Sequence, residues 1–301
     1  MEVDRRPHGH PHHPREPFCK INELNSTSTV FSFSPEEFQK TAVFLNGWFS
    51  RGGHVRLSQN PDTSVKDVAV NVTLYTGQDK LVKEVVLAAF DHEGQYGVEV
   101  KREGHHHHQR HEKPKKKDCL VYNIDVQFPA HVDYFENVDL HIKSAQRIEG
   151  GAGLENIEFG SVRAGLGHGA IIFDGLKAKK IELGVLTGVV MGEYQPSERF
   201  AAASLHGATK VKLLPTGENI NISASTVAGP SSIDLPADSF AGNFFVSALF
   251  GGSPSIIAPN PEDIHVTKIR PIYKAGYYKE QNTGSQVYVG SKHGSAKLVF
   301  H

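Results

Sequence analysis

The chain alternates apolar and polar residues over short segments, and Gly, Asn, Asp or Pro fill the gaps between them. No stretch of 12 residues carries a convincing helical period. From residue 120 onward, apolar pairs or triplets spaced by one residue recur about every 10–15 residues. This period-two pattern predicts an all-β fold of short strands, because alternate side chains of a strand lie on one face. Clear examples are Ile171/Phe173, Ile181/Leu183, Val211/Leu213 and Ile220/Ile222.

Three segments follow from the same pattern. The composition of residues 1–27 predicts a disordered tail, because His and Pro dominate the first part of this segment. Residues 28–119 predict antiparallel strands that are interrupted by an exposed loop, rich in His and Lys, over residues 101–118. Residues 120–301 predict a longer β domain that begins with a cleanly alternating strand at 120–128.

Two architectures fit the domain at 120–301. One is a sandwich of antiparallel strands, and the other is a β-solenoid whose successive coils lay each strand beside the preceding one. The recurring glycines favour the solenoid, because repeated tight corners need residues that tolerate unusual backbone angles. These glycines are Gly150, Gly151, Gly153, Gly160, Gly165, Gly167, Gly169, Gly175, Gly184, Gly188 and Gly192.

Several stretches carry a family resemblance. The segments 159–164, 169–178 and 180–184 show a rhythm of the form G-x-I-x-L-x-x-L-x-A, and 222–236 and 240–247 continue it. The closing segment 294–300 fits a last coil. In these residues the sequence resembles the DUF4097-type family of adhesin-like proteins of bacteria and fungi. The resemblance implies a right-handed β-solenoid with no catalytic residues to carry over, and an adhesin-type binding role.

The chain departs from exported members of that family at its start. Met1-Glu2-Val3-Asp4 leads into His and Pro without the apolar core of a secretion signal, which favours a cytoplasmic or vacuolar location over secretion. No apolar run approaches the roughly 18–20 residues that span a bilayer, so no transmembrane segment is expected. Acceptor patterns for N-glycosylation at Asn25, Asn71 and Asn221 keep a secretory or vacuolar route open.

The net charge of the chain limits the classes of partner that it can bind. The formal net charge is -1 and the sequence pI is about 7.0, so the general surface is unsuited to nucleic acid. Near-zero net charge weakens repulsion between copies and therefore favours self-association.

The two cysteines, Cys19 and Cys119, exclude a disulfide-rich scaffold. Two free thiols, a bridge within the chain and a bridge between chains all remain open at this point. For a self-associating protein, we consider an intermolecular disulfide through these residues as a lock on the assembly.

Histidines gather in the tail, at His8, His10, His12 and His13, and in the loop, at His105, His106, His107, His108 and His111. Crowded imidazoles bind Zn²⁺, Ni²⁺ or Cu²⁺ and gain charge at mildly acidic pH, so the loop is a candidate for metal- or pH-responsive binding. The competing interpretation is a solvated insert with only adventitious metal affinity, because no Cys or carboxylate stands at a fixed ligand spacing. No resident cofactor is therefore expected. The adjoining run at 113–117 is interpreted as a solvated basic loop.

Tyrosines cluster late, at Tyr273, Tyr277, Tyr278 and Tyr288. Tyr is enriched at protein interfaces and also stacks on sugars, so Tyr273, Tyr277 and Tyr278 are candidate interface residues. Ordinary packing under the last coils is the alternative. Residues 165–169 are glycine-rich but lack the spacing of a nucleotide-binding loop, and corners explain them better.

Three functions remain. The first is a non-enzymatic structural protein that associates with itself through open strand edges. The second is an adhesin-type binding module for a glycan or surface protein. The third is an enzyme of the kind in which a β-helix cleaves polysaccharides, and no paired row of acidic and basic residues supports it. We therefore expect a binding or structural protein without catalysis.

Overall fold

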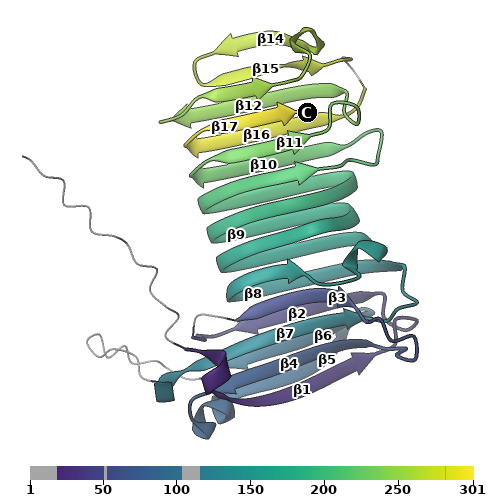
Figure 1. Ribbon diagram of the computed structural model, residues 1–301, viewed down its shortest axis with the longest axis vertical. Helices are drawn as coiled ribbons and strands as arrows, with labels where there is room; N and C mark the ends of the chain where they lie inside the picture. Colours follow the sequence, from purple (N-terminus) through teal and green to yellow (C-terminus); the bar gives the residue numbers. More distant parts are fainter. Residues whose placement is uncertain (1–18, 51–52, 104–115, 282) are drawn as a thin grey trace, which may run out of the picture.

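The chain folds into one elongated stack of β-strands, as Figure 1 shows. The computed structural model describes residues 19–50, 53–103, 116–281 and 283–301. The strands form a mixed 17-stranded sheet, and the described helices are short 3-10 turns. The predicted all-β class is confirmed. Most of the predicted tail and of the His- and Lys-rich loop lies outside the described residues.

The strands are unequal in length, and β9 is by far the longest, with 56 residues. The bounds of the elements, in chain order, are η1 (Ile21–Glu23), β1 (Asn25–Phe33), β2 (Lys40–Asn46), β3 (His54–Gln59), β4 (Val68–Thr76), η2 (Asp79–Glu84), β5 (Val85–His92), β6 (Gln95–Arg102), η3 (Lys116–Asp118), β7 (Leu120–Phe128), β8 (Tyr134–Gly150), η4 (Leu154–Asn156), β9 (Glu158–Leu213), β10 (Asn221–Ala228), β11 (Ser231–Leu235), β12 (Gly242–Phe250), β13 (Pro254–Ile257), η5 (Pro261–Asp263), β14 (Ile264–Arg270), β15 (Tyr273–Tyr278), β16 (Gln286–His293) and β17 (Ala296–Phe300).

The middle of the stack is wound from consecutive chain. β9 pairs in parallel with β8 before it and with β10 and β11 after it. The prediction of separate short strands is wrong here, because the chain turns its corners without an intervening loop and strand β9 continues through them. Figure 1 shows β9 as a continuous ribbon that passes back and forth across the stack.

Glycines allow those bends. Gly169, Gly188 and Gly207 recur every 19 residues and have φ angles of +134°, +141° and +146°. A Cβ on Gly188 would lie 1.7 Å from the carbonyl oxygen of Gly169, and a Cβ on Gly207 would lie 1.7 Å from that of Gly188. Only glycine fits where the backbones of successive turns approach so closely. Gly229 and Gly294 extend this corner column toward the C-terminal end.

At the N-terminal end, spatial order departs from chain order. β2 lies in parallel between β6 and β8, and β3 lies in parallel between β7 and β8. The pairs β1–β4, β4–β7 and β5–β6 are antiparallel. The predicted antiparallel character of this part therefore holds for the outer strands, whereas β2 and β3 continue the parallel stacking of the middle.

The C-terminal end contains the same kind of insertion of strands between others that are distant in the sequence. β16 lies in parallel between β10 and β12, and β17 lies in parallel between β11 and β13. The hairpin β14–β15 then closes this end through antiparallel pairing of β15 with β12. The chain thus returns to insert its last strands between the layer of β10 and β11 and the layer of β12 and β13, as the yellow strands in Figure 1 show.

Side chains that point inward form one continuous apolar core from Phe33 to Phe300. Aromatic rings pack edge to face within it, as Phe128 does with Phe135 and Phe159. The alternating pattern predicts these positions well, because inward and outward residues alternate along each strand.

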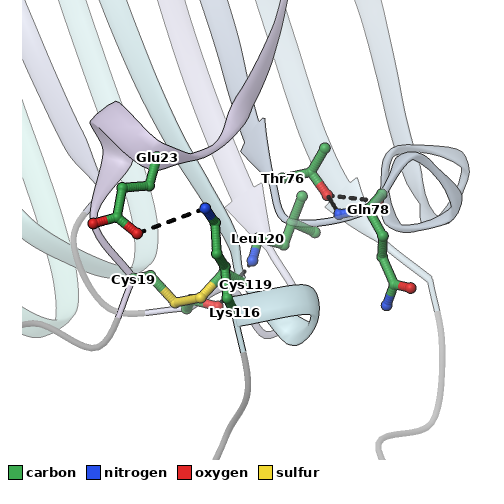
Figure 2. The surroundings of a disulfide bond; sticks show 8 residues. Cys19, Glu23, Thr76, Gln78, Lys116, Cys119 and Leu120 are labelled. Carbon is green, nitrogen blue, oxygen red and sulfur yellow. Dashed lines mark hydrogen bonds and ion pairs between the residues drawn. A yellow bond between two sulfur atoms is a disulfide. The ribbon is translucent and has the colours of Figure 1, made fainter.

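Cys19 and Cys119 form a disulfide within the chain, with a sequence separation of 100. The considered bridge between chains is therefore corrected, and neither sulfur is a free thiol. Figure 2 shows the bond beside the ion pair between Lys116 Nζ and Glu23 Oε2, which are 3.6 Å apart. The bond fastens the segment before β1 to the start of β7.

Candidate functional site: an axial groove

Outward side chains on one long surface stack into columns. We call this surface face A; it comprises β5, β6, β2, residues 134–143 of β8, residues 158–167, 180–186 and 199–206 of β9, then β10, β16, β12, β15 and β14. Because the strand pairing keeps its register, residues in equivalent positions lie one above another along the stack.

One column of face A consists of small residues. Gly165, Gly184, Ala203 and Ser225 follow one another in successive turns, and Ala203 pairs directly with Ser225. Two surface hollows share these four residues, one of about 360 Å³ and one of about 790 Å³. We call the combined depression the axial groove, because it runs along the stacking direction rather than along a strand.

An apolar wall borders the groove on one side. Leu186, Leu205 and Val227 occupy the neighbouring column and are 59%, 41% and 37% exposed. Large apolar side chains that stay this accessible in consecutive turns form a patch of the kind that marks interaction sites.

The opposite wall is polar. The carboxylate of Glu182 lies 3.4 Å from Arg163 Nε and 3.5 Å from Arg199 Nε, so two guanidinium groups share one carboxylate. Toward the N-terminal end, Asp139 accepts hydrogen bonds at Oδ2 from Asn137 and Gln95, while its buried Oδ1 has no hydrogen-bond partner. This wall offers donors and hydroxyl groups, the latter from Ser223 and Ser225.

Aromatic rings flank the small-residue column at both ends. Phe44 stacks on His141 with ring centroids 5.0 Å apart and planes 3° from parallel. At the other end, Phe245 stacks on Tyr273 and on Tyr288 at 5.3 Å and 5.8 Å. Phe245 and Tyr288 are 38% and 39% exposed.

Gly290 lies in the small-residue column and leaves room for the aromatic cluster. A Cβ at this position would lie 2.2 Å from the hydroxyl oxygen of Tyr288, so the Tyr288 side chain leans across Gly290. The site therefore combines apolar surface, rings and charged donors, which suits binding of an extended chain that is itself part polar and part apolar.

The opposite surface, face B, comprises β4, β7, β3, residues 147–150 of β8, β11, β17, β13 and the intervening parts of β9. It carries charged side chains, among them Arg56, Asp125, Arg147 and Glu149. Burial raises the pKa of Asp125, against the effect of nearby Arg56. Burial also acts to raise the pKa of Glu149, but hydrogen bonds from Arg56 and Arg147 outweigh it and lower the pKa overall.

The predicted interface tyrosines separate into two groups. Tyr278 is fully buried and stacks on Phe300 at 3.9 Å, so its prediction as an interface residue is wrong and core packing explains it. Tyr273 belongs to the exposed aromatic cluster, and Tyr277 stacks on His265 at 4.5 Å on face A. An interface role for Tyr273 and Tyr277 stays a prediction.

The histidines His105, His106, His107, His108 and His111 lie outside the described residues, so the metal- or pH-responsive loop stays a prediction. Within the described ranges, no cluster of three or more His, Cys, Asp or Glu side chains is arranged to hold a metal ion. No helix in the described part of the chain is long and apolar enough to span a bilayer.

Sequence reasoning missed the groove floor. Gly165 and Gly184 were expected at corners, but they lie in the middle of face A, and neither has the positive φ of Gly169 and its equivalents. The signal was present as a 19-residue spacing of small residues at 165, 184 and 203, offset from the corner glycines by four residues.

Comparisons with known proteins find only distant structural similarity. No family profile matches the sequence, and no curated protein matches it. A candidate cell adhesion protein from Clostridium sporogenes matches with a TM-score of 0.40 and 13% identity, covering 92% of this chain and 100% of that one. A candidate lipid-binding protein from Parabacteroides distasonis has a TM-score of 0.40 and 10% identity, covering 90% and 96%.

A candidate adhesin from Bacteroides fragilis is similar at a TM-score of 0.34 and 11% identity, covering 91% of this chain and 97% of that one. Some of these similar structures are thus candidate adhesins, while the DUF4097 type itself stays a prediction. At such TM-scores and identities, the likenesses carry no argument about function, which has to come from the groove.

Proposed function

We propose that this protein is a non-catalytic, adhesin-type binding module that holds an extended chain, of a glycan or a surface protein, in the axial groove. The observation that carries the proposal is the floor of small residues that continues through successive turns between an apolar and a polar wall. A compact ligand would need a closed pocket, whereas an open groove along the stack suits a polymer.

The proposal includes the β-solenoid architecture of the DUF4097-type adhesin-like family. Parallel pairing of β8, β9 and β10 and the 19-residue recurrence of corner glycines support it over a sandwich of antiparallel strands. A right-handed winding is the expected one, because parallel crossovers are almost always right-handed.

An array of glycans and surface proteins, probed with the full chain, tests the binding role. The variant Gly184→Leu should fill the groove without disturbing the fold, because a Cβ at Gly184 meets nothing within 4 Å. Ser232→Leu on β11 of face B is the matched control. We expect signals that Gly184→Leu abolishes and Ser232→Leu preserves; an array without signals, or with signals that Gly184→Leu leaves intact, contradicts the groove as the binding site.

Self-association is a second candidate function, favoured by strand β14. This strand lies at the C-terminal end of the stack, pairs with β15 and exposes its side chains from His265 to Arg270, including Ile269 at 68%. An edge strand of this kind can pair with another copy. Light scattering after size-exclusion chromatography should then show oligomers that Ile269→Lys reduces, and a strict monomer at high concentration would exclude the idea.

A further inference from the structure

The two walls of the axial groove differ in charge as well as in polarity, and this difference bears on the ligand. Arg163 and Arg199 have only the carboxylate of Glu182 between them, and their side chains are 58% and 55% exposed. Each guanidinium carries five N–H donors, so one carboxylate cannot satisfy both groups. Unsatisfied N–H donors are therefore left over on the polar wall, beside the small-residue floor.

A third cation lies at the N-terminal end of the groove. Lys143 lines the groove, and its Nζ lies 4.8 Å from the centroid of the Trp48 ring. Asp139 pairs with Arg163 in the register and adds a negative charge there, but its Oδ2 accepts hydrogen bonds from Asn137 and Gln95, so it leaves the donors of Arg163 available. The groove therefore presents cationic groups on the polar wall and at one end.

The backbone beneath the groove is fully engaged in strand pairing. β10 pairs with β9 on one side and with β16 on the other, so the floor offers no free strand edge. An extended peptide would gain none of the main-chain hydrogen bonds by which sheets usually capture peptides. A sugar chain needs no such edge, because its rings present apolar faces to aromatic and small residues and hydroxyl groups to polar ones.

From these features we infer that the axial groove takes an acidic glycan, whose carboxylate groups bind between Arg163 and Arg199 while its sugar rings lie along the small-residue floor. This inference rests on the proposed function and names its ligand class. Glu182 competes with the ligand for the same two guanidinium groups, so it acts as an internal substitute for the ligand carboxylate.

Calorimetric titration of the full chain tests this with uronate polymers: oligogalacturonate, alginate and hyaluronate. Methyl-esterified oligogalacturonate has the same backbone without free carboxylates, and polyglutamate supplies carboxylates on a peptide. We expect at least one uronate polymer to bind, and its neutral counterpart to bind about tenfold more weakly or worse, since a hydrogen bond to a charged group contributes that much.

The charge variants give results of opposite sign. Arg163→Gln and Arg199→Gln should each weaken binding about tenfold, whereas Glu182→Gln should strengthen it, because it frees both guanidinium groups. Lys212→Gln is the matched control, since it removes one positive charge from an ion pair with Glu193 on face B and should leave affinity unchanged. All these ion pairs are exposed and add little stability, so the variants should fold.

Several outcomes overturn the inference. They are equal affinity for esterified and free oligogalacturonate, weaker binding by Glu182→Gln, equal or tighter binding of polyglutamate, and no binding of any uronate polymer. If a neutral glycan binds and Gly184→Leu abolishes that binding, the groove stands and only the acidic ligand class fails. If binding survives Gly184→Leu, the proposed function itself fails.

Discussion

Two columns of small residues run along the same turns, and they exist for different reasons. In the corner column, a Cβ on Gly188 would meet a carbonyl oxygen at 1.7 Å, so the fold requires glycine there. In the groove floor, a Cβ on Gly184 meets nothing within 4 Å, and one on Gly165 meets its nearest atoms at 3.9 Å. The fold does not require small residues in the groove floor, which makes them a sign of binding.

The addition of one methyl group in each column should separate their roles. Gly188→Ala should lower the free energy of unfolding by about 4 kcal/mol or more, because the added carbon collides with backbone and sits at a positive φ. Gly184→Ala should change it by less than about 0.5 kcal/mol. Denaturant titrations measure the free energy of unfolding of both variants, provided that its dependence on denaturant concentration is the same. Similar losses of stability in the two variants would contradict the different roles of the two columns.

Removal of the disulfide should also change the stability of the fold without changing ligand binding. Replacing Cys19 and Cys119 together by Ser should cost about 2–4 kcal/mol, since the bond closes a loop with a sequence separation of 100 in the unfolded chain. Because the bond lies at η1 and η3 rather than on the groove floor, ligand affinity of the folded variant should not change. Thermal melts with and without reductant check the first expectation, and a parallel titration checks the second.

The aromatic ends of the groove should matter for affinity and little for folding. Tyr288→Ala and Phe245→Ala should each weaken binding of the groove ligand about twofold to tenfold, the range expected for ring stacking. Tyr134→Ala is the matched control, because Tyr134 is an exposed ring on β8, outside the cluster of Phe245, Tyr273 and Tyr288. Equal effects of all three variants would remove the aromatic cluster from the site.

The smallest expected effect is a pH dependence of stability that arises on face B. Burial raises the pKa of Asp125 above its ordinary 3.8, so its charged form is disfavoured in the folded state. Asp125→Asn should therefore raise the melting temperature at pH 7, where the penalty is complete, and lose this advantage as the pH falls through the raised folded-state pKa toward 3.8. A variant that is less stable than the wild type at pH 7 would show that attraction to Arg56 dominates instead.

Much of the fold follows from local pattern. The alternating segment at 120–128 became β7 (Leu120–Phe128), and inward positions such as Ile171 and Phe173 are fully buried. Period-two alternation reports burial directly, so it predicts such elements.

The order of the strands at the ends could not be predicted in this way. The insertion of β2–β3 before β8 and of β16–β17 between β10–β11 and β12–β13 depends on contacts between distant segments. Local alternation is the same whichever neighbour a strand takes. The groove could not be predicted for a related reason. Gly165 and Gly169 are the same residue type in the sequence, and they differ only in the atoms that an added side chain would meet.

Hydrogen–deuterium exchange of the full chain, with and without a polysaccharide from the array, tests the groove most directly. We expect the ligand to protect the face A segments 161–167, 180–186 and 199–206, one in each successive turn. We expect no change in the face B segments 170–174 and 189–193. Protection confined to face B or to the β14–β15 hairpin, with face A unchanged, would contradict binding in the groove.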